Sequence, residues 1–176
     1  MKKYQISSRI LHWIMAAIII FLLALGIYMA DFLPKDAPNR MEFYNLHKSF
    51  GVLALILIIV RIINRAVFTP PSLPETINKL EQKLAYLAHI LLYLLMVLVP
   101  LSGYLMSNSF GYPVNLFGFK MPFLIEKNAD LGKIFHETHE IAPYILIIVL
   151  LLHIAGVIKH RYFDKNKEND VLKRMV

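Results

Sequence analysis

The chain has 176 residues, which favours one domain, and its hydrophobic fraction of 57% is high for a soluble protein. It contains no cysteine, which excludes disulfides, thiolate zinc sites, iron–sulfur clusters and covalent attachment of a c-type haem. The net charge of +7 is distributed unevenly along the chain.

Four apolar segments lie near residues 10–30, 47–67, 86–107 and 140–160. Each is long enough to cross about 30 Å of hydrocarbon as a helix. The segments are continuous and lack the alternation of a barrel strand, so helices are expected. We therefore predict an all-α, integral membrane four-helix bundle formed by a single domain, residues 1–176. The first segment is longer than the core of a signal peptide and no cleavage site follows it, so we expect it to be retained.

The connections between these segments differ in character. The first, near residues 31–46, contains two prolines, and three more in residues 69–74 end the second helix. Ser72 and Glu75 have the spacing of a capping box, which predicts a new helix near Leu73. The connection at about 108–133 is rich in Gly, Pro and Phe, and we expect it to lie against the outer membrane face.

The charges indicate how the chain is oriented in the membrane. With four spans, both termini and the 68–85 connection share one side, which carries thirteen Lys and Arg residues against five Asp and Glu residues. The other side carries six Lys and Arg residues against seven Asp and Glu residues. The positive-inside rule predicts that both termini are cytoplasmic. The basic surplus thus indicates contact with anionic membrane lipid and no nucleic-acid partner.

The histidines separate into two sets by their expected depth in the membrane. The outer set is His47, His136 and His139, and the inner set is His12, His89, His153 and His160. Polar side chains are costly in lipid, so those within spans are candidates for function that face the bundle interior.

The spacing within the last span gives a sharper prediction. His139 and His153 are fourteen residues apart, which is within roughly 40° of four whole turns and places them about 21 Å apart along one helix face. His47 lies at the expected depth of His139, and His12 at that of His153. The shared face and the matching depths predict two bis-imidazole haem sites, one above the other. The separation suits electron transfer through two stacked macrocycles and is far too long for a dinuclear metal site.

His136 competes with His139, since it is one turn away. Its spacing of seventeen residues from His153 rotates it about 100° off the shared face, so we prefer His139. His136 lies instead near the edge of the outer haem or in the solvated interface. The cations within or beside the spans either meet haem propionates or extend to lipid headgroups. They are Lys48 beside His47, Arg9 near His12, and Arg61.

Short motifs follow one another along nearly the whole chain: Arg9-Ile10-Leu11-His12-Trp13, Leu46-His47-Lys48-Ser49 with Gly51, Leu87-Ala88-His89-Ile90-Leu91-Leu92-Tyr93, Lys159-His160-Arg161-Tyr162-Phe163 and Leu172-Lys173-Arg174-Met175. Together with the His139–His153 spacing, they resemble the bacterial cytochrome b561 family of four-helix, di-haem membrane cytochromes. The resemblance implies two non-covalent b haems, the inner one bound by His12 and His153 and the outer one by His47 and His139.

The resemblance also implies a function in the bacterial inner membrane. Short stand-alone members are similar to superoxide oxidase, which takes electrons from superoxide outside and passes them to ubiquinone. His160 matches the position that such proteins use at their inner quinone site, and we place Arg9 and His89 near it. Four ligands already suffice for two haems, so His89 is alternatively a packing histidine. His136 is not part of the family pattern.

We therefore expect an oxidoreductase whose outer haem edge receives electrons from a small donor such as superoxide. Bis-histidine iron has no open position for oxygen, and positive charge from Lys48 and Lys133 favours an anion. One alternative is a cytochrome b membrane-anchor subunit that relays electrons between a partner redox enzyme and quinone. An alternative of another class is a haem-free, histidine-lined ion transporter.

Overall fold

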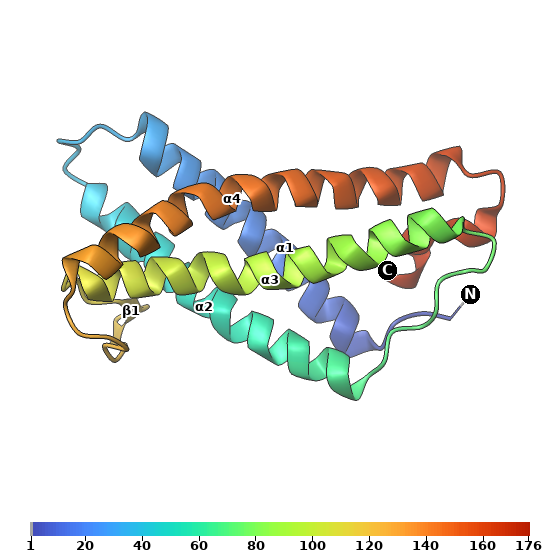
Figure 1. Cartoon of the computed structure of the whole chain (residues 1–176), viewed down its shortest axis with the longest axis horizontal. Coiled ribbons are helices and arrows are strands. Elements are labelled where there is room, and N and C mark those ends of the chain that lie inside the picture. Colours follow the sequence, from blue (N-terminus) through green and yellow to red (C-terminus); the bar gives the residue numbers. More distant parts are fainter. Residues whose placement is uncertain (1) are drawn as a thin grey trace.

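The computed structural model describes residues 2–176 and is built from four long helices (Figure 1). They are α1 (Ile6–Ile27), α2 (Arg40–Val67), α3 (Lys79–Ser109) and α4 (Ala129–Ile158). Two five-residue π-helical turns extend α1 and α4: η1 (Tyr28–Phe32) and η2 (Lys159–Phe163). All four helices are long and apolar enough to cross a membrane. The prediction of an all-α, four-helix membrane bundle is confirmed.

Helices α2 and α3 each contain an expected apolar segment, as do α1 and α4 together with η1 and η2, and each continues beyond it, most clearly at the start of α4. The sequence pattern underestimates these lengths because polar residues extend each helix beyond its apolar stretch. Many large apolar side chains face outward, including Ile59, Ile148 and Leu152, which are 51%, 58% and 65% exposed. Such a surface is suited to contact with lipid tails.

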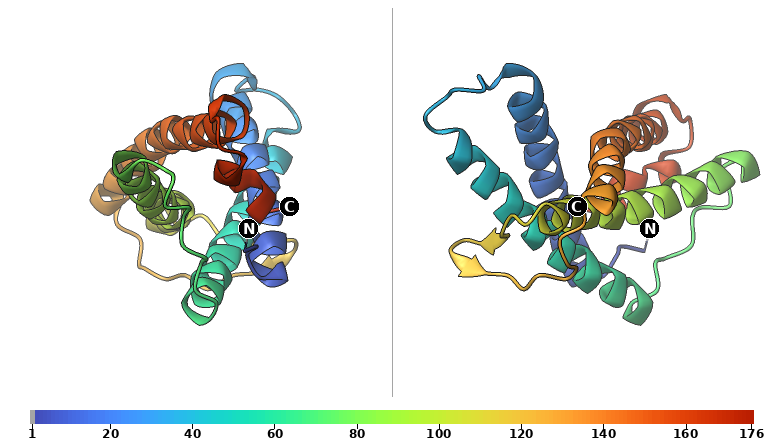
Figure 2. Two further views of the ribbon diagram at one scale, coloured as in Figure 1. Left: turned by 90° about the vertical axis from the view of Figure 1, so that its right-hand side faces the viewer. Right: turned by 60° about the vertical axis from the view of Figure 1, so that its left-hand side comes forward.

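The two ends of the bundle can be told apart by what lies there. Both chain termini lie at one end, the termini end, and a short β-hairpin lies at the opposite end, the hairpin end (Figure 1). Helices α3 and α4 run side by side along the long axis, while α1 and α2 cross them at an angle (Figures 1 and 2). Leu92 and Leu95 of α3 pack against Ala142, Leu146 and Val149 of α4 in the bundle core.

The connection between α3 and α4 folds over the hairpin end. Its strands β1 (Asn115–Leu116) and β2 (Phe119–Lys120) pair antiparallel around a turn whose two residues, Phe117 and Gly118, have positive φ. Such φ angles are typical of two-residue hairpin turns. The Ser49 hydroxyl of α2 donates to the Asn115 carbonyl at 3.0 Å and accepts from the Phe117 N–H at 3.1 Å. These two bonds hold the hairpin against the bundle.

The prediction of a helix beginning near Leu73 is wrong. Residues 69–78 form extended chain and a turn, and α3 begins at Lys79. Asn78 provides the N-cap, because its side chain accepts from the Leu80 N–H at 2.9 Å. The Ser72 carbonyl accepts a hydrogen bond from Arg174 instead of starting a helix.

The C-terminal tail packs against the termini end as two 3-10 turns, η3 (Lys167–Asn169) and η4 (Val171–Arg174). Arg174 is only 2% exposed and donates to the carbonyls of Pro71 and Ser72. The Trp13 indole of α1 donates to the Met175 carbonyl at 2.9 Å. The tail therefore joins α1 to the connection before α3, and the basic composition alone did not predict this.

Candidate functional site

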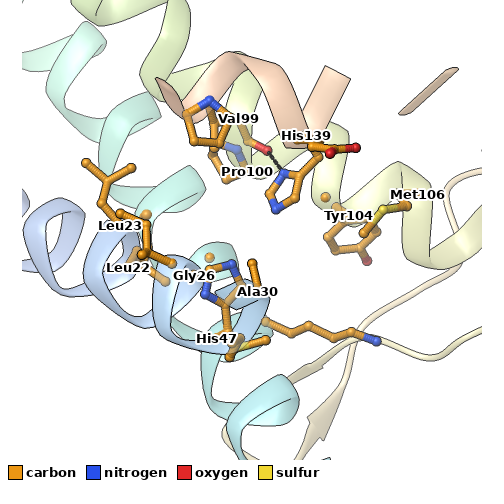
Figure 3. Close-up of a pocket in the computed structure, with 18 of the residues that line it drawn as sticks. Leu22, Leu23, Gly26, Ala30, His47, Val99, Pro100, Tyr104, Met106 and His139 are labelled. Carbon is orange, nitrogen blue, oxygen red and sulfur yellow. Dashed lines mark hydrogen bonds between the residues drawn. The ribbon is translucent and has the colours of Figure 1, made fainter. Parts of the chain in front are cut away.

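A histidine pair lies across a cavity toward the hairpin end. His47 of α2 and His139 of α4 have ring centroids 6.1 Å apart, with ring planes at 81°. The cavity measures about 600 Å³, which is within the range of cofactor sites. Figure 3 shows the two rings pointing toward one another from facing helices, with Gly26 and Ala30 of the α1–η1 segment beside His47.

The His139 ring is held in one orientation by α3. Its Nδ1–H donates to the Val99 carbonyl at 2.8 Å, as the dashed line in Figure 3 marks. A carbonyl bonded at Nδ1 leaves the Nε2 lone pair free, which is the usual arrangement of a metal-binding histidine. Gly103 makes room for the ring, because a Cβ there would lie 2.7 Å from Cε1 of His139.

His47 has a polar atom without a partner. Its Nδ1 is buried and has no hydrogen-bond partner among the described residues. A buried ring nitrogen without a partner is costly and calls for an explanation, such as an absent ligand. A Cβ at Gly26 would lie 3.5 Å from Cε1 of His47, so the helix backbone closely approaches this ring.

A second group of histidines lies toward the termini end. His153 of α4 has its ring centroid 6.5 Å from that of His12 on α1 and 5.3 Å from that of His89 on α3. Two imidazoles that bind the same metal ion from opposite sides, each at about 2 Å, have ring centroids a little more than 6 Å apart. The His12–His153 separation suits a shared iron, whereas His89 is close enough to contact the His153 ring directly.

Arg61 of α2 contacts His12. Its Nη2 lies 2.7 Å from Nδ1 of His12, and its Nε donates to the Tyr93 hydroxyl at 3.1 Å. Arginine only donates, so a neutral His12 carries its proton on Nε2 in this arrangement. Binding of iron at Nε2 would require His12 to change tautomer and Arg61 to find another acceptor, for which a haem propionate is suitable.

The other residues expected at the outer site are placed as follows. His136 is exposed, lines the same cavity and pairs with Glu140 at 3.6 Å. Lys48 also lines the cavity and donates to the Pro113 carbonyl at 3.4 Å. The Lys133 side chain is 73% exposed and pairs with Asp130. The structure thus brings His136 and Lys48 to the cavity and leaves Lys133 on the surface.

The residues expected at the quinone site are not joined into one cluster. His160 donates from Nδ1 to Asp164 at 2.8 Å, and His89 bonds the Ala85 carbonyl of its own helix at 2.6 Å. The Arg9 Nε is buried without a hydrogen-bond partner within residues 2–176. Within the described residues, no hydrogen bond joins Arg9, His89 or His160 to one another.

A profile of the prokaryotic cytochrome b561 family matches residues 3–176. The chain belongs to this family. It is similar to cytochrome b561 homolog 2 of Escherichia coli K12, with 28% identity over 99% of this chain and 92% of that protein. It is 27% identical to the probable superoxide oxidase CybB of Yersinia pestis, over 99% and 96% of the two chains, and 22% identical to cytochrome b561 homolog 1 of E. coli K12, over 99% and 98%. The predicted resemblance is confirmed.

Membership of the cytochrome b561 family supports redox activity, transmembrane electron transfer and a b-type haem. Together with the four spanning helices, it indicates a protein of the bacterial inner membrane. The described residues suit a haem at the His47–His139 pair on three counts: the buried Nδ1 without a partner, the space left by Gly103 and the cavity itself.

Sequence reasoning missed a charged cluster around His160. Lys159 bridges Glu81 of α3 and Asp164, and Asp164 also accepts from His160. Asp164 lies four residues after His160, so helical spacing could have indicated that pair. Glu81 comes from another helix, and no spacing in the sequence connects it to His160.

Proposed function

We propose that the whole chain, residues 1–176, acts as one membrane domain that carries electrons through two b haems. A small diffusible donor such as superoxide gives electrons at the hairpin end, and ubiquinone receives them at the termini end. The observation that supports this most strongly is that α4 presents His139 and His153 to two different partners, His47 and His12, at centroid separations of 6.1 and 6.5 Å. Each pair has the separation expected of two imidazoles on one iron.

The proposed ligands are His47 and His139 for the hairpin-end haem, and His12 and His153 for the termini-end haem. Each bound haem would supply a one-electron carrier whose axial positions are both filled by imidazole, which disfavours direct coordination of oxygen. The protein's part is to fix the rings. Val99 orients His139, and the packing of α1 on α2, of α2 on α3 and of α3 on α4 brings each partner into place.

The proposed orientation places the termini end in the cytoplasm. Both termini and the connection between α2 and α3 lie at this end, and this side carries most of the lysines and arginines. A basic side is the one that remains in the cytoplasm. The hairpin end then faces the outside of the inner membrane, where a small anionic donor would reach the cavity of His47 and His139.

Superoxide is the proposed donor at this cavity. Lys48 and Arg40 line it, together with His136, and Asp31 and Glu140 equal the two cations in number, so the support from charge is local to Lys48 and Arg40. Local positive charge at an entrance raises the encounter rate of an anion. The relative in Y. pestis named a probable superoxide oxidase adds support. Lys133, at the start of α4, is paired with Asp130 on the surface and adds no net charge.

Ubiquinone is placed at the termini end, near His160, Arg9 and His89. The Nε of Arg9 is a buried donor without a hydrogen-bond partner in the described chain, and His160 carries an imidazole whose nitrogens donate and accept hydrogen bonds. Both are suited to a quinone oxygen. His89 contacts the His153 ring and either borders the quinone or packs against the proposed ligand.

Stopped-flow mixing of the purified, haem-loaded protein with superoxide, with and without ubiquinone, tests this function. We expect superoxide to reduce the haems rapidly and added ubiquinone to reoxidise them. Haem reduction no faster than the background of superoxide dismutation would contradict a superoxide donor. Reduction that requires an added or co-purified redox protein would instead identify a protein partner as the donor.

A further inference from the structure

A cluster of four titratable side chains lies at the termini end of α3 and α4. The His160 Nδ1–H donates to Asp164 Oδ2 at 2.8 Å. Lys159 Nζ bonds Asp164 Oδ1 at 2.8 Å and both oxygens of Glu81 at 2.8 and 2.9 Å. His160 and Asp164 are shielded, with side chains 12% and 10% exposed, while Lys159 and Glu81 are 44% and 34% exposed. The cluster therefore runs from a shielded pair to the solvent.

Asp164 is held in place and in its ionised form. Donation from Lys159 and from His160 keeps the pKa of the Asp164 carboxyl well below its usual range. The Asn169 side chain donates to Oδ2 as well, at 2.8 Å, and Thr76 in turn donates to Asn169. A carboxylate that stays ionised and is bonded to Nδ1 orients an imidazole and stabilises its protonated form, without itself taking the proton.

The other ring nitrogen of His160 faces Glu81. Nε2 of His160 lies 3.7 Å from Oε2 of Glu81, which belongs to another helix. Since Asp164 fixes the proton on Nδ1, the Nε2 of neutral His160 is the site that accepts and releases a proton. Glu81 and Lys159 are the partly exposed members of the cluster and connect it to solvent.

We propose that Asp164 is a positioning residue for His160, and that Glu81 returns protons from solvent to its Nε2 during quinone reduction. This inference rests on the proposed function. For each proton transferred, the Nε2–H bond of protonated His160 breaks and an O–H bond forms on the quinone. Two such transfers, with two electrons taken from the donor that is oxidised at the other end, convert quinone to quinol. Glu81 resupplies Nε2 and regains its proton from water.

Further ion pairs near the cluster join Asp170 of the C-terminal tail to Arg161 of η2 at 3.9 Å and to Lys173 at 3.6 Å. Within residues 2–176, these pairs make no hydrogen bond to His160. Glu81, Lys159 and Asp164 are therefore the charged groups whose changes should alter the pH dependence of His160.

Two variants, Glu81→Gln and Asp164→Asn, test the proposal in the haem-loaded protein. The matched control is Glu168→Gln, which removes an exposed carboxylate from the same tail. The protein is first reduced, and its oxidation by ubiquinone is followed at several pH values. General acid–base groups typically contribute 10²- to 10⁴-fold, so we expect each test variant to slow the maximal rate by about tenfold or more while the KM for ubiquinone changes little.

The pH dependence of the lost rate distinguishes impaired proton supply from general structural damage. For Glu81→Gln, the deficit should grow as the pH rises, since solvent protons become scarce, and added acetic acid should partly restore the rate. Haem reduction by the donor should stay at its wild-type rate. A pH-independent loss without rescue, or a Glu81→Gln variant as fast as Glu168→Gln, would overturn the inference.

A second measurement does not depend on turnover. In the reduced, diamagnetic protein with ¹⁵N-labelled histidine, the wild-type Nδ1 of His160 should give the signal of a protonated nitrogen. The signal is assigned with His160→Gln. Asp164→Asn should move the chemical shifts of both ring nitrogens toward the average of the two tautomers. Unchanged chemical shifts would contradict the positioning role. If wild-type protein is not oxidised by ubiquinone at all, the proposed function fails. If ubiquinone oxidises the wild-type protein and the variants match it, the inference fails and the proposed function stands.

Discussion

Gly103 of α3 and His139 of α4 fit together at the α3–α4 interface. A Cβ at position 103 would lie 2.7 Å from Cε1 and 2.9 Å from Nδ1 of the His139 ring. The same ring donates to the Val99 carbonyl, one turn earlier on α3. The imidazole therefore occupies the space that any side chain at position 103 would need, and its freedom to retreat is limited by the bond to Val99.

Gly103→Ala should disturb the hairpin-end haem. The added methyl group must displace the His139 ring, because contacts below 3.0 Å are not tolerated and the ring is bonded to the neighbouring carbonyl. We expect loss or a strong spectral change of one of the two b haems. The haem-to-protein ratio and the reduced-minus-oxidised spectrum measure this. The matched control is Gly156→Ala on α4, where a Cβ meets nothing within 4 Å. A hairpin-end haem lost equally in both variants would argue against the specific fit.

Substitutions of the termini-end histidines should separate ligands from neighbours. His12→Ala and His153→Ala should each remove or severely disturb the same b haem, since the 6.5 Å separation of their rings suits a shared iron. His89→Ala should retain both haems, because its ring contacts that of His153 directly at 5.3 Å. Haem content and spectra after purification decide between them. Two intact haems in His153→Ala, or one lost haem in His89→Ala, would show that the pairing is wrong.

The bundle and the facing histidines could be predicted from sequence because both depend on regular geometry. A span needs a fixed length of apolar helix, and residues fourteen apart on a helix share a face. His139 and His153 satisfy the second condition without knowledge of any contact. The geometry of His47 follows less directly, since it depends on how α2 packs against α3, which in turn carries α4.

The termini end could not be predicted in the same way. The start of α3 depends on whether Ser72 or Asn78 caps it, and the carbonyl of Ser72 is engaged by Arg174, about a hundred residues later. The bonds among Glu81, Lys159 and Asp164 likewise join different segments. Contacts of this kind depend on tertiary packing, and periodicity carries no information about them.

Arg174 should stabilise the C-terminal tail more than its neighbour. It is 2% exposed and bonds two backbone carbonyls, whereas the Lys173 side chain is 60% exposed. Arg174→Met removes both hydrogen bonds from a buried guanidinium to Pro71 and Ser72, and should cost about 1–3 kcal/mol of local stability. Each of Arg174→Met and Lys173→Met removes one tryptic site, so they form a matched pair. Faster tryptic cleavage at Lys165 and Lys167 is expected only in Arg174→Met, and equal rates would contradict this role.

Asp164 should make the stability of the termini end depend on acidic pH. Hydrogen bonds from Lys159 and His160 lower the pKa of its carboxyl in the folded protein, so the unfolded chain binds the proton more readily. The stabilisation is therefore complete above the ordinary carboxyl pKa of about 3.9 and is lost as the pH falls from there toward the lowered folded value.

Asp164→Asn should accordingly lower the thermal midpoint in detergent at pH 7 by a few degrees. The difference from wild type should narrow as the pH is lowered below about 4, because the wild-type carboxylate then becomes protonated more readily in the unfolded state. Asp36→Asn serves as the control, since this exposed carboxylate lies in the connection between α1 and α2. It should keep the wild-type midpoint and pH dependence. A constant difference between Asp164→Asn and wild type at every pH would mean that the carboxylate charge is not the source of the stabilisation.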